Sequence, residues 1–229
     1  MKRALLVVAL LAATFAARVD TAGATSECRG FMECAPVAGP WVVVPTSHAV
    51  PRPQVQYQLT CPRGFVVGGV DAELTDKAIE LWFLGASGSP VSPGRTTSRT
   101  IVFVATYAGT RAKAPTFRPH AGCIPAAGGG SRTPTSVSSV VPPGHPTIRR
   151  VRTVRVAAQT VVSVSCHRDE HLVAAYSAGG FRMPKPPTEQ LALSLSTHPR
   201  IDGKRVSVSA HGGGSRAVVQ VEAVCAGGR

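Results

Sequence analysis

Side chains that could bind a metal ion gather between Cys166 and His171. Within this short segment, His167, Asp169 and Glu170 accompany the cysteine and the second histidine. A zinc site would need a free thiolate and the ligand spacing of a helix or a knuckle, but the internal repeat described below places Cys166 in a disulfide. We therefore interpret the segment as a solvated turn, with a metal site and a catalytic role as alternatives, and predict no metal and no cofactor.

Four acidic residues lie within ten positions, at Asp71, Glu73, Asp76 and Glu80. Such a density of oxygen ligands suits Ca²⁺, but the segment lacks the Asp-x-Asp-x-Asp-Gly loop of an EF-hand. Two of these carboxylates, held a suitable distance apart, would also serve a glycosidase as acid and base. We favour a polar rim on a turn over both kinds of site.

The chain has no recognisable motif for nucleophilic catalysis. Neither Gly-x-Ser-x-Gly nor His-Glu-x-x-His occurs in it, and these are the patterns that place a serine nucleophile or a zinc ion. A cysteine nucleophile needs a free thiolate, and a complete pairing of the six cysteines leaves none. We predict no catalytic residue and keep a small secreted hydrolase, or an enzyme inhibitor, as the alternative function.

A basic stripe lies just before the strand that leads into Cys166 and consists of Arg149, Arg150, Arg152 and Arg155. Such a stripe binds polyanions through charge attraction and counterion release. Nucleic-acid recognition usually adds exposed aromatic rings for stacking, and none occurs between Cys123 and Tyr176. We predict an anion-binding stripe without specific nucleic-acid recognition; the alternative is protective charge on a strand edge.

The composition favours a β-protein with a hydrophobic core. Of 229 residues, 44% are hydrophobic and 16% charged, which excludes wholesale disorder. Aromatic residues make up only 5%, whereas 23 glycines and 19 prolines favour short strands joined by turns over long helices. Lysine and arginine number 25 against 12 acidic residues, giving a net charge of +13. The chain is therefore expected to meet anionic partners.

The first 24 residues are typical of a signal peptide. Lys2 and Arg3 precede an apolar run of 14 residues from Ala4 to Ala17, and residues 22–24, Ala-Gly-Ala, supply the small residues that a signal peptidase recognises. The run is too short to span a membrane comfortably, because a spanning helix needs about 20 residues. We predict cleavage after Ala24 and a secreted or extracytoplasmic protein with no membrane span in the mature chain.

Two parts of the remaining chain resemble each other. Residues 55–61 match residues 160–166, and residues 116–123 match residues 218–225. Each match ends in a cysteine, and the separations between the paired cysteines are 62 and 59 residues. Between these anchors, residues 102–104 align with residues 206–208. The pattern predicts two related β-units in tandem, against the alternative that strand-rich sequences are alike by composition.

The repeat and its alternation also select a disulfide pairing. Strand residues at alternate positions share a face, which places Cys61, Cys166 and Cys225 on apolar faces opposite polar ones that include Gln58 and Glu222. Of 15 conceivable pairings of six cysteines, the repeat favours Cys61–Cys123, Cys166–Cys225 and Cys28–Cys34. Bonds that close each unit through its interior suit an exported protein.

The same alternation predicts further strands and the domain limits. Residues 79–84 fit a strand. Leu191, Leu193 and Leu195 alternate with polar or small residues, and Val206 and Val208 alternate with Ser207 and Ser209, as in strands with one solvated face. The expected organisation is a signal peptide at 1–24, a small disulfide loop at 25–40, a β-unit at 41–126, a glycine- and proline-rich linker at 127–147, and a second β-unit at 148–229.

The stretch Cys-Pro-Arg-Gly-Phe-Val-Val-Gly-Gly at residues 61–69, with Val-Cys-Ala at 224–226, resembles a repeat of exported, largely uncharacterised bacterial proteins. The second copy departs from that pattern, with His167 and Asp169 at the positions of Pro62 and Gly64. The resemblance implies an exported β-repeat protein and supplies no activity. An immunoglobulin sandwich is a weaker analogy, because Trp82 comes late after the cysteine and the second copy lacks a tryptophan.

These observations predict an all-β protein of two related, disulfide-braced, sandwich-like units. The expected function is a non-enzymatic binding or structural module at the bacterial cell surface. Its expected partners are an anionic envelope polymer, met through the arginine stripe, or another protein.

Overall fold

The computed structural model describes residues 25–47, 49–84, 99–110, 114–126 and 147–227. The predicted signal peptide and all but the last residue of the predicted linker lie outside these ranges. The all-β prediction is confirmed: within the described residues only one short α-helix and one 3₁₀ turn accompany the strands. No helix in these ranges is long and apolar enough to cross a membrane.

Strands follow one another closely through both parts of the chain. The first part contains β1 (Ala35–Ala38), β2 (Trp41–Val43), β3 (Val55–Thr60), β4 (Phe65–Leu74), β5 (Ile79–Leu84), β6 (Thr100–Tyr107) and β7 (Thr116–Pro125). The second contains β8 (Thr147–Arg155), β9 (Gln159–Ser165), β10 (Glu170–Phe181), α2 (Glu189–Leu193), β11 (Ser196–Asp202), β12 (Arg205–His211), the 3₁₀ turn η1 (Gly214–Arg216) and β13 (Ala217–Gly227).

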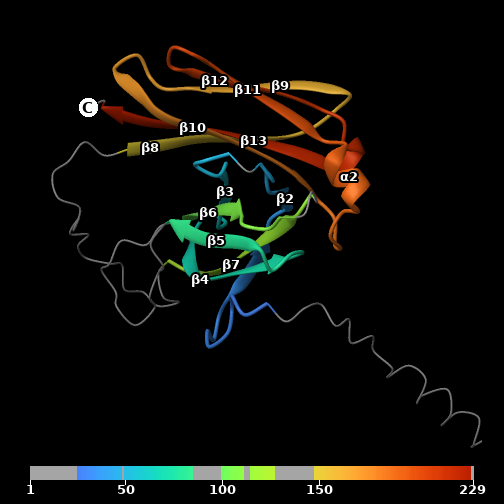
Figure 1. The fold of residues 1–229 in the computed structure, drawn as a ribbon. Coiled ribbons are helices and arrows are strands. Elements are labelled where there is room, and N and C mark those ends of the chain that lie inside the picture. The colour runs from blue at the N-terminus through green and yellow to red at the C-terminus, as the bar shows by residue number, and fades with distance from the viewer. Residues whose placement is uncertain (1–24, 48, 85–98, 111–113, 127–146, 228–229) are drawn as a thin grey trace, which may run out of the picture.

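The described residues form three sheets. In the seven-stranded sheet, β4 pairs with one edge of β7, and β1 and β2 pair one after the other with its opposite edge. The sheet then continues from β2 through β10 and β13 to β8. Two three-stranded sheets, β3–β6–β5 and β11–β12–β9, complete the fold. In Figure 1 the second part lies above the first, and β2 lies between them. The small sheet of each part thus packs against its own end of the long sheet.

The order of strand pairing is the same in the two parts. β4 pairs antiparallel with β7 as β10 does with β13, and each pair contains one register shift near its start. β6 lies between β3 and β5 as β12 lies between β9 and β11. The parts are nevertheless joined by a strand, because β2 pairs with β7 on one side and with β10 on the other. β1, inside the segment predicted as a disulfide loop, is an antiparallel partner of β7.

Each part has its own hydrophobic core, closed by one disulfide. Phe103 and Phe117, both fully buried, lie in the first core, and Phe181 lies in the second. The predicted bonds Cys61–Cys123 and Cys166–Cys225 are present, as is Cys28–Cys34. No free cysteine occurs among the described residues. The alternation of apolar residues therefore gave the correct core face for every cysteine tested by it.

Two expectations about individual strands are wrong. Residues 189–193 form α2, in place of the strand expected from the alternating leucines, because the Thr188 side chain accepts a hydrogen bond from the backbone nitrogen of Leu191 and caps the first turn. The expected alignment of residues 102–104 with 206–208 is also shifted, since Phe103 points into its core whereas Ser207 faces away from the second.

The N-terminal segment crosses the outer surface of β4 and β7. The carbonyl of Glu27 lies directly over Gly69 and Gly122, where a Cβ atom at either position would collide with it. Ser26 donates hydrogen bonds from its backbone nitrogen and its hydroxyl to Asp71, over 2.6 and 3.1 Å. Glycine is therefore required here for close approach of two backbones.

Candidate functional site

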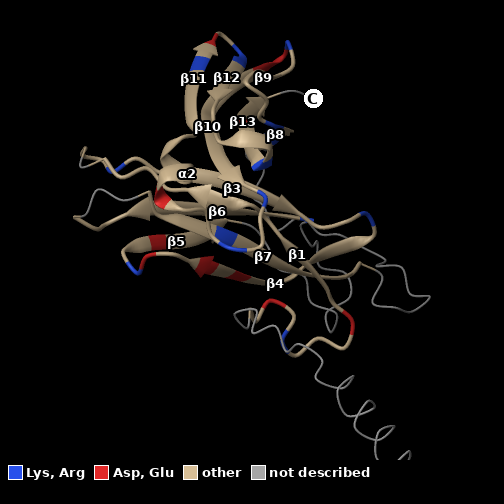
Figure 2. Ribbon diagram, turned by 90° about the vertical axis from the view of Figure 1, so that its right-hand side faces the viewer, with Lys and Arg blue, Asp and Glu red and all other residues tan. Residues whose placement is uncertain are grey.

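The predicted basic stripe lies on β8, an edge strand of the long sheet. β8 pairs only with β13 within the described ranges. Among the described residues, Arg149 and Arg150 form ion pairs with glutamates, and Arg152 and Arg155 do not. Figure 2 shows β8 apart from β4, whose acidic residues are red. The exposed pair, Arg152 and Arg155, has no acidic partner in the described part of the chain.

Arg149 forms an ion pair with Glu222 inside the second part, where that part meets β3 of the first. Glu222 is 1% exposed on β13, and one of its oxygens has no hydrogen-bond partner. Burial raises the pKa of Glu222, and the charge of Arg149 opposes that rise. Arg149 also donates a hydrogen bond of 3.1 Å to Gln56 on β3. This arginine therefore takes part in the contact between the two parts.

Gln220 extends the same contact. Its side-chain amide accepts a hydrogen bond from the backbone nitrogen of Gln58 over 2.7 Å and donates to the backbone oxygen of Gln58 over 3.1 Å. It thereby satisfies the free edge of β3 as a neighbouring strand would. Gln56, Gln220 and Glu222, expected on polar faces, are buried because these faces meet each other.

Arg150 pairs with Glu170 near the second disulfide. The guanidinium donates two hydrogen bonds to the carboxylate, over 3.1 and 2.6 Å. The backbone nitrogen of His167 donates a third, over 2.7 Å. The bonds from Arg150 and then that from His167 lower the pKa of Glu170. Glu170 therefore anchors both β8 and the turn that leads into β10.

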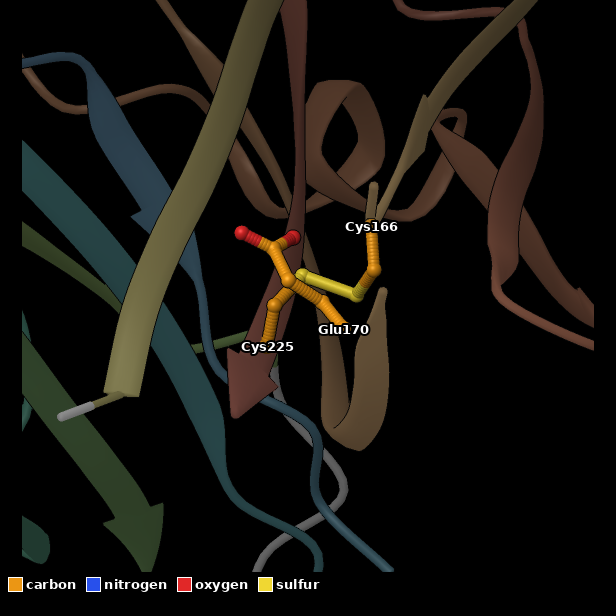
Figure 3. Close-up of side chains that lie close together, drawn as sticks. All are labelled: Cys166, Glu170 and Cys225. Atoms are coloured by element: carbon orange, nitrogen blue, oxygen red, sulfur yellow. A yellow bond between two sulfur atoms is a disulfide. The ribbon is translucent and has the colours of Figure 1, made fainter. Parts of the chain in front are cut away.

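The segment from Cys166 to His171 forms a turn whose histidines and Asp169 are exposed. Figure 3 shows the carboxylate of Glu170 beside the sulfurs of Cys166 and Cys225. These sulfurs are bonded to each other, so neither is a thiolate that could hold a metal. The arrangement closes a sandwich and leaves the two neighbouring histidines in solvent.

The acidic segment does not gather its carboxylates around one point. Asp71 binds the N-terminal segment, Asp76 accepts hydrogen bonds from Tyr107 and the backbone of Ala78, and Glu80 accepts one from Thr106. Although burial raises the pKa of Asp71, hydrogen bonds from the backbone nitrogens of Ser26 and Ala72 outweigh it and lower that pKa overall. Each carboxylate instead stabilises a different local contact.

Beneath the N-terminal segment lies a partly buried ionisable cluster, of which sequence patterns indicated only Glu73. Nδ1 of His120 is 3.7 Å from Glu27 and Nε2 is 2.9 Å from Glu73. Arg118 lies 3.7 Å from Glu73. Glu27 of the N-terminal segment lies near one ring nitrogen of His120 on β7, and Glu73 on β4 lies near the other. His120 therefore connects the segment to both strands, and the two carboxylates do not surround a shared ion.

The outer face of β11–β12–β9 is open and polar. On β12, Ser207 and Ser209 point away from the core while Val206 and Val208 point into it. His198 and His211 are exposed on the same side, on β11 and β12. The alternation of serine and valine predicted a solvated face here, but the histidines are 13 residues apart, and only the strand register brings them together.

Two hollows near the second part of the molecule hold no titratable side chain. One, of about 350 Å³, is lined by Val156, Ala157, Ala158, Gly212, Gly214 and Ser215. Another, of about 270 Å³, is lined by Val43, Pro45, Gln54, Val55, Ser177, Gly179, Leu195 and Thr197. Neither offers an acid, a base or a charged anchor for a substrate.

Comparisons of the chain with models of protein families, with curated proteins and with solved structures find no match. Its function must therefore be inferred from its own residues.

Proposed function

We propose that this chain is an exported, non-enzymatic binding module that engages an anionic polymer of the bacterial envelope through β8. The observation that carries the proposal is the pair of exposed arginines, Arg152 and Arg155, on an edge strand without an acidic partner in the described ranges. Cations placed in this way attract a polyanion with little loss of internal pairing. The net charge of +13 adds a long-range attraction of the same sign.

Export is supported by the pattern of the first 24 residues and by the three disulfides, which persist in oxidising compartments. We further infer that the two parts are related copies of one β-unit, and that the chain belongs with the exported bacterial repeat proteins it resembles. The shared order of strand pairing and the equivalent placement of two disulfides support the duplication.

Co-sedimentation of the purified protein with isolated bacterial envelope, across a series of salt concentrations, tests this proposal. Wild-type binding should weaken steeply as salt rises, because counterions compete for the polymer. The double variant Arg152→Gln/Arg155→Gln should lose most of the binding seen at low salt. The matched control Arg200→Gln/Arg205→Gln removes the same charge from exposed positions on β11 and β12 and should retain most of it.

Equal losses in both double variants would show that total charge, and not β8, determines binding, and would refute the assigned surface. Absence of wild-type binding at low salt would refute the polymer-binding function itself. Turnover of esterase, glycosidase or protease substrates by the purified protein would favour a secreted hydrolase.

A further inference from the structure

His198 and His211 lie side by side on the open face of the small sheet of the second part. In the β11–β12 register, His211 is opposite Ser196, and His198 is two residues farther along β11 on the same face. The centroids of the two imidazole rings are 5.7 Å apart and their planes differ by 26°. Both side chains are exposed. The fold thus presents two nitrogen ligands together to solvent.

The backbone beneath these rings is firmly held. β12 forms seven register pairs with β11 and seven with β9. On the opposite face, Val206, Val208 and Ala210 are fully buried in the second core. The Ser196 hydroxyl lies 2.8 Å from Nε2 and 3.0 Å from Nδ1 of His211, which restrains that ring. Fixed Cα positions reduce the cost of ordering a two-ligand site.

Paired imidazoles suit late transition metals. Neutral imidazole binds Zn²⁺, Ni²⁺ and Cu²⁺, and affinity for a given ligand set is highest for Cu²⁺. A shared ion must lie about 2.0 Å from a nitrogen of each ring. Rotation about the side-chain torsions would bring both rings to that distance from one ion. Arg200, two residues beyond His198 on the same face, repels all divalent cations equally, so the preference for Cu²⁺ comes from the imidazole ligands.

We propose that His198 and His211 form a surface site for a divalent late-transition-metal ion, with Cu²⁺ bound most tightly. Water and the Ser196 hydroxyl fill the remaining coordination positions. The site is independent of the anion-binding function proposed for β8, since it uses a different sheet and a different ligand class.

Titration with Cu²⁺ alone tests the site. The full-length processed protein, without an affinity tag and with its disulfides intact, is freed of metal by chelation and titrated by calorimetry. Electron paramagnetic resonance is recorded at the end point. We expect one ion per chain with nitrogen coupling in the spectrum. His198→Gln and His211→Gln should each weaken binding by more than about tenfold, a loss typical of damage to a metal site.

The matched control is His171→Gln, which removes an exposed histidine from β10 in the same part of the chain. It should leave the Cu²⁺ affinity and the spectrum unchanged. Thermal unfolding without metal verifies that each variant is folded. Unchanged affinity in the double variant His198→Gln/His211→Gln would overturn the proposal, as would the absence of stoichiometric binding by the wild type.

Discussion

The central strands β6 and β12 hold the same position in their three-stranded sheets, yet their surroundings differ. After Thr100, every residue of β6 is buried, whereas β12 alternates between buried valine or alanine and more exposed serine. β6 is covered on both faces, and β12 is covered only on the face that meets its own core. The same pattern of strand pairing therefore gives a central strand that is covered on both faces in the first part and on one face in the second.

This difference explains where polar groups are free to act. In the first part, Gln56 on β3 is committed to the contact with the second part. In the second part, the equivalent small sheet leaves His198 and His211 in solvent. The surfaces proposed for binding belong to the second part.

The largest effect should come from removing one long disulfide from either part. Because the closed loops are of similar length, with separations of 62 and 59 residues, Cys61→Ala/Cys123→Ala and Cys166→Ala/Cys225→Ala should each lower the free energy of unfolding by about 4 kcal/mol. Denaturant titration measures both. A loss in only one of the two variants would show that the parts do not depend equally on their bonds.

Exchanging a valine and a serine between the core-distal faces of the central strands β6 and β12 should change the free energy of unfolding less, and by different amounts in the two strands. Val104 is 1% exposed, so Val104→Ser should destabilise the protein by about 2 kcal/mol through lost apolar burial and a buried hydroxyl. Ser207→Val, on the open face of β12, should change stability by less than about 0.5 kcal/mol. Similar losses in the two variants, compared by urea unfolding, would mean that the face of β12 is also covered.

The two arginine–glutamate pairs of β8 should differ in the sign of their pH dependence. Because the pKa of Glu222 is raised in the folded state, its contribution to the free energy of unfolding falls as pH rises from its unfolded pKa through its folded pKa. A lowered pKa means that Glu170 contributes stability above its unfolded pKa and loses it as pH falls through the folded value. The contributions of Glu222 and Glu170 to the free energy of unfolding should therefore change with pH in opposite directions.

Unfolding measured from pH 3 to 7 for Glu222→Gln and Glu170→Gln would check these slopes. Relative to wild type, Glu222→Gln should gain stability with rising pH, and Glu170→Gln should lose it. We expect these to be the smallest of the effects considered, since each involves the titration of a single group. Slopes of the same sign would contradict the different environments of Glu222 and Glu170.

The sequence predicted the features that depend on alternation and on cysteine spacing. Alternating valine and serine in residues 206–209 predicted one solvated face, and the spacing of the matched segments predicted all three disulfides. The same reasoning failed where alternation was absent or misleading. Both faces of β6 are apolar, so alternation did not determine how the sequence of β6 aligns with that of β12. The leucines near α2 do alternate, but a local cap favours a helix there.

The remaining features depend on contacts between distant segments. That Arg149 and Arg150 would meet Glu222 and Glu170 follows from the β8–β13 register and from the packing of β3, which no local pattern encodes. The proximity of His198 and His211 likewise requires the hairpin register. Charge counts alone do not show that two of the four arginines form ion pairs within the chain.

The short strand β2 also has a mechanical consequence. It links the two ends of the long sheet through only two register pairs on each side. Under tension applied across the molecule, this seam should yield before the longer ladders within either part. The disulfides at residues 61–123 and 166–225 would then keep each loop closed and limit how far the chain extends.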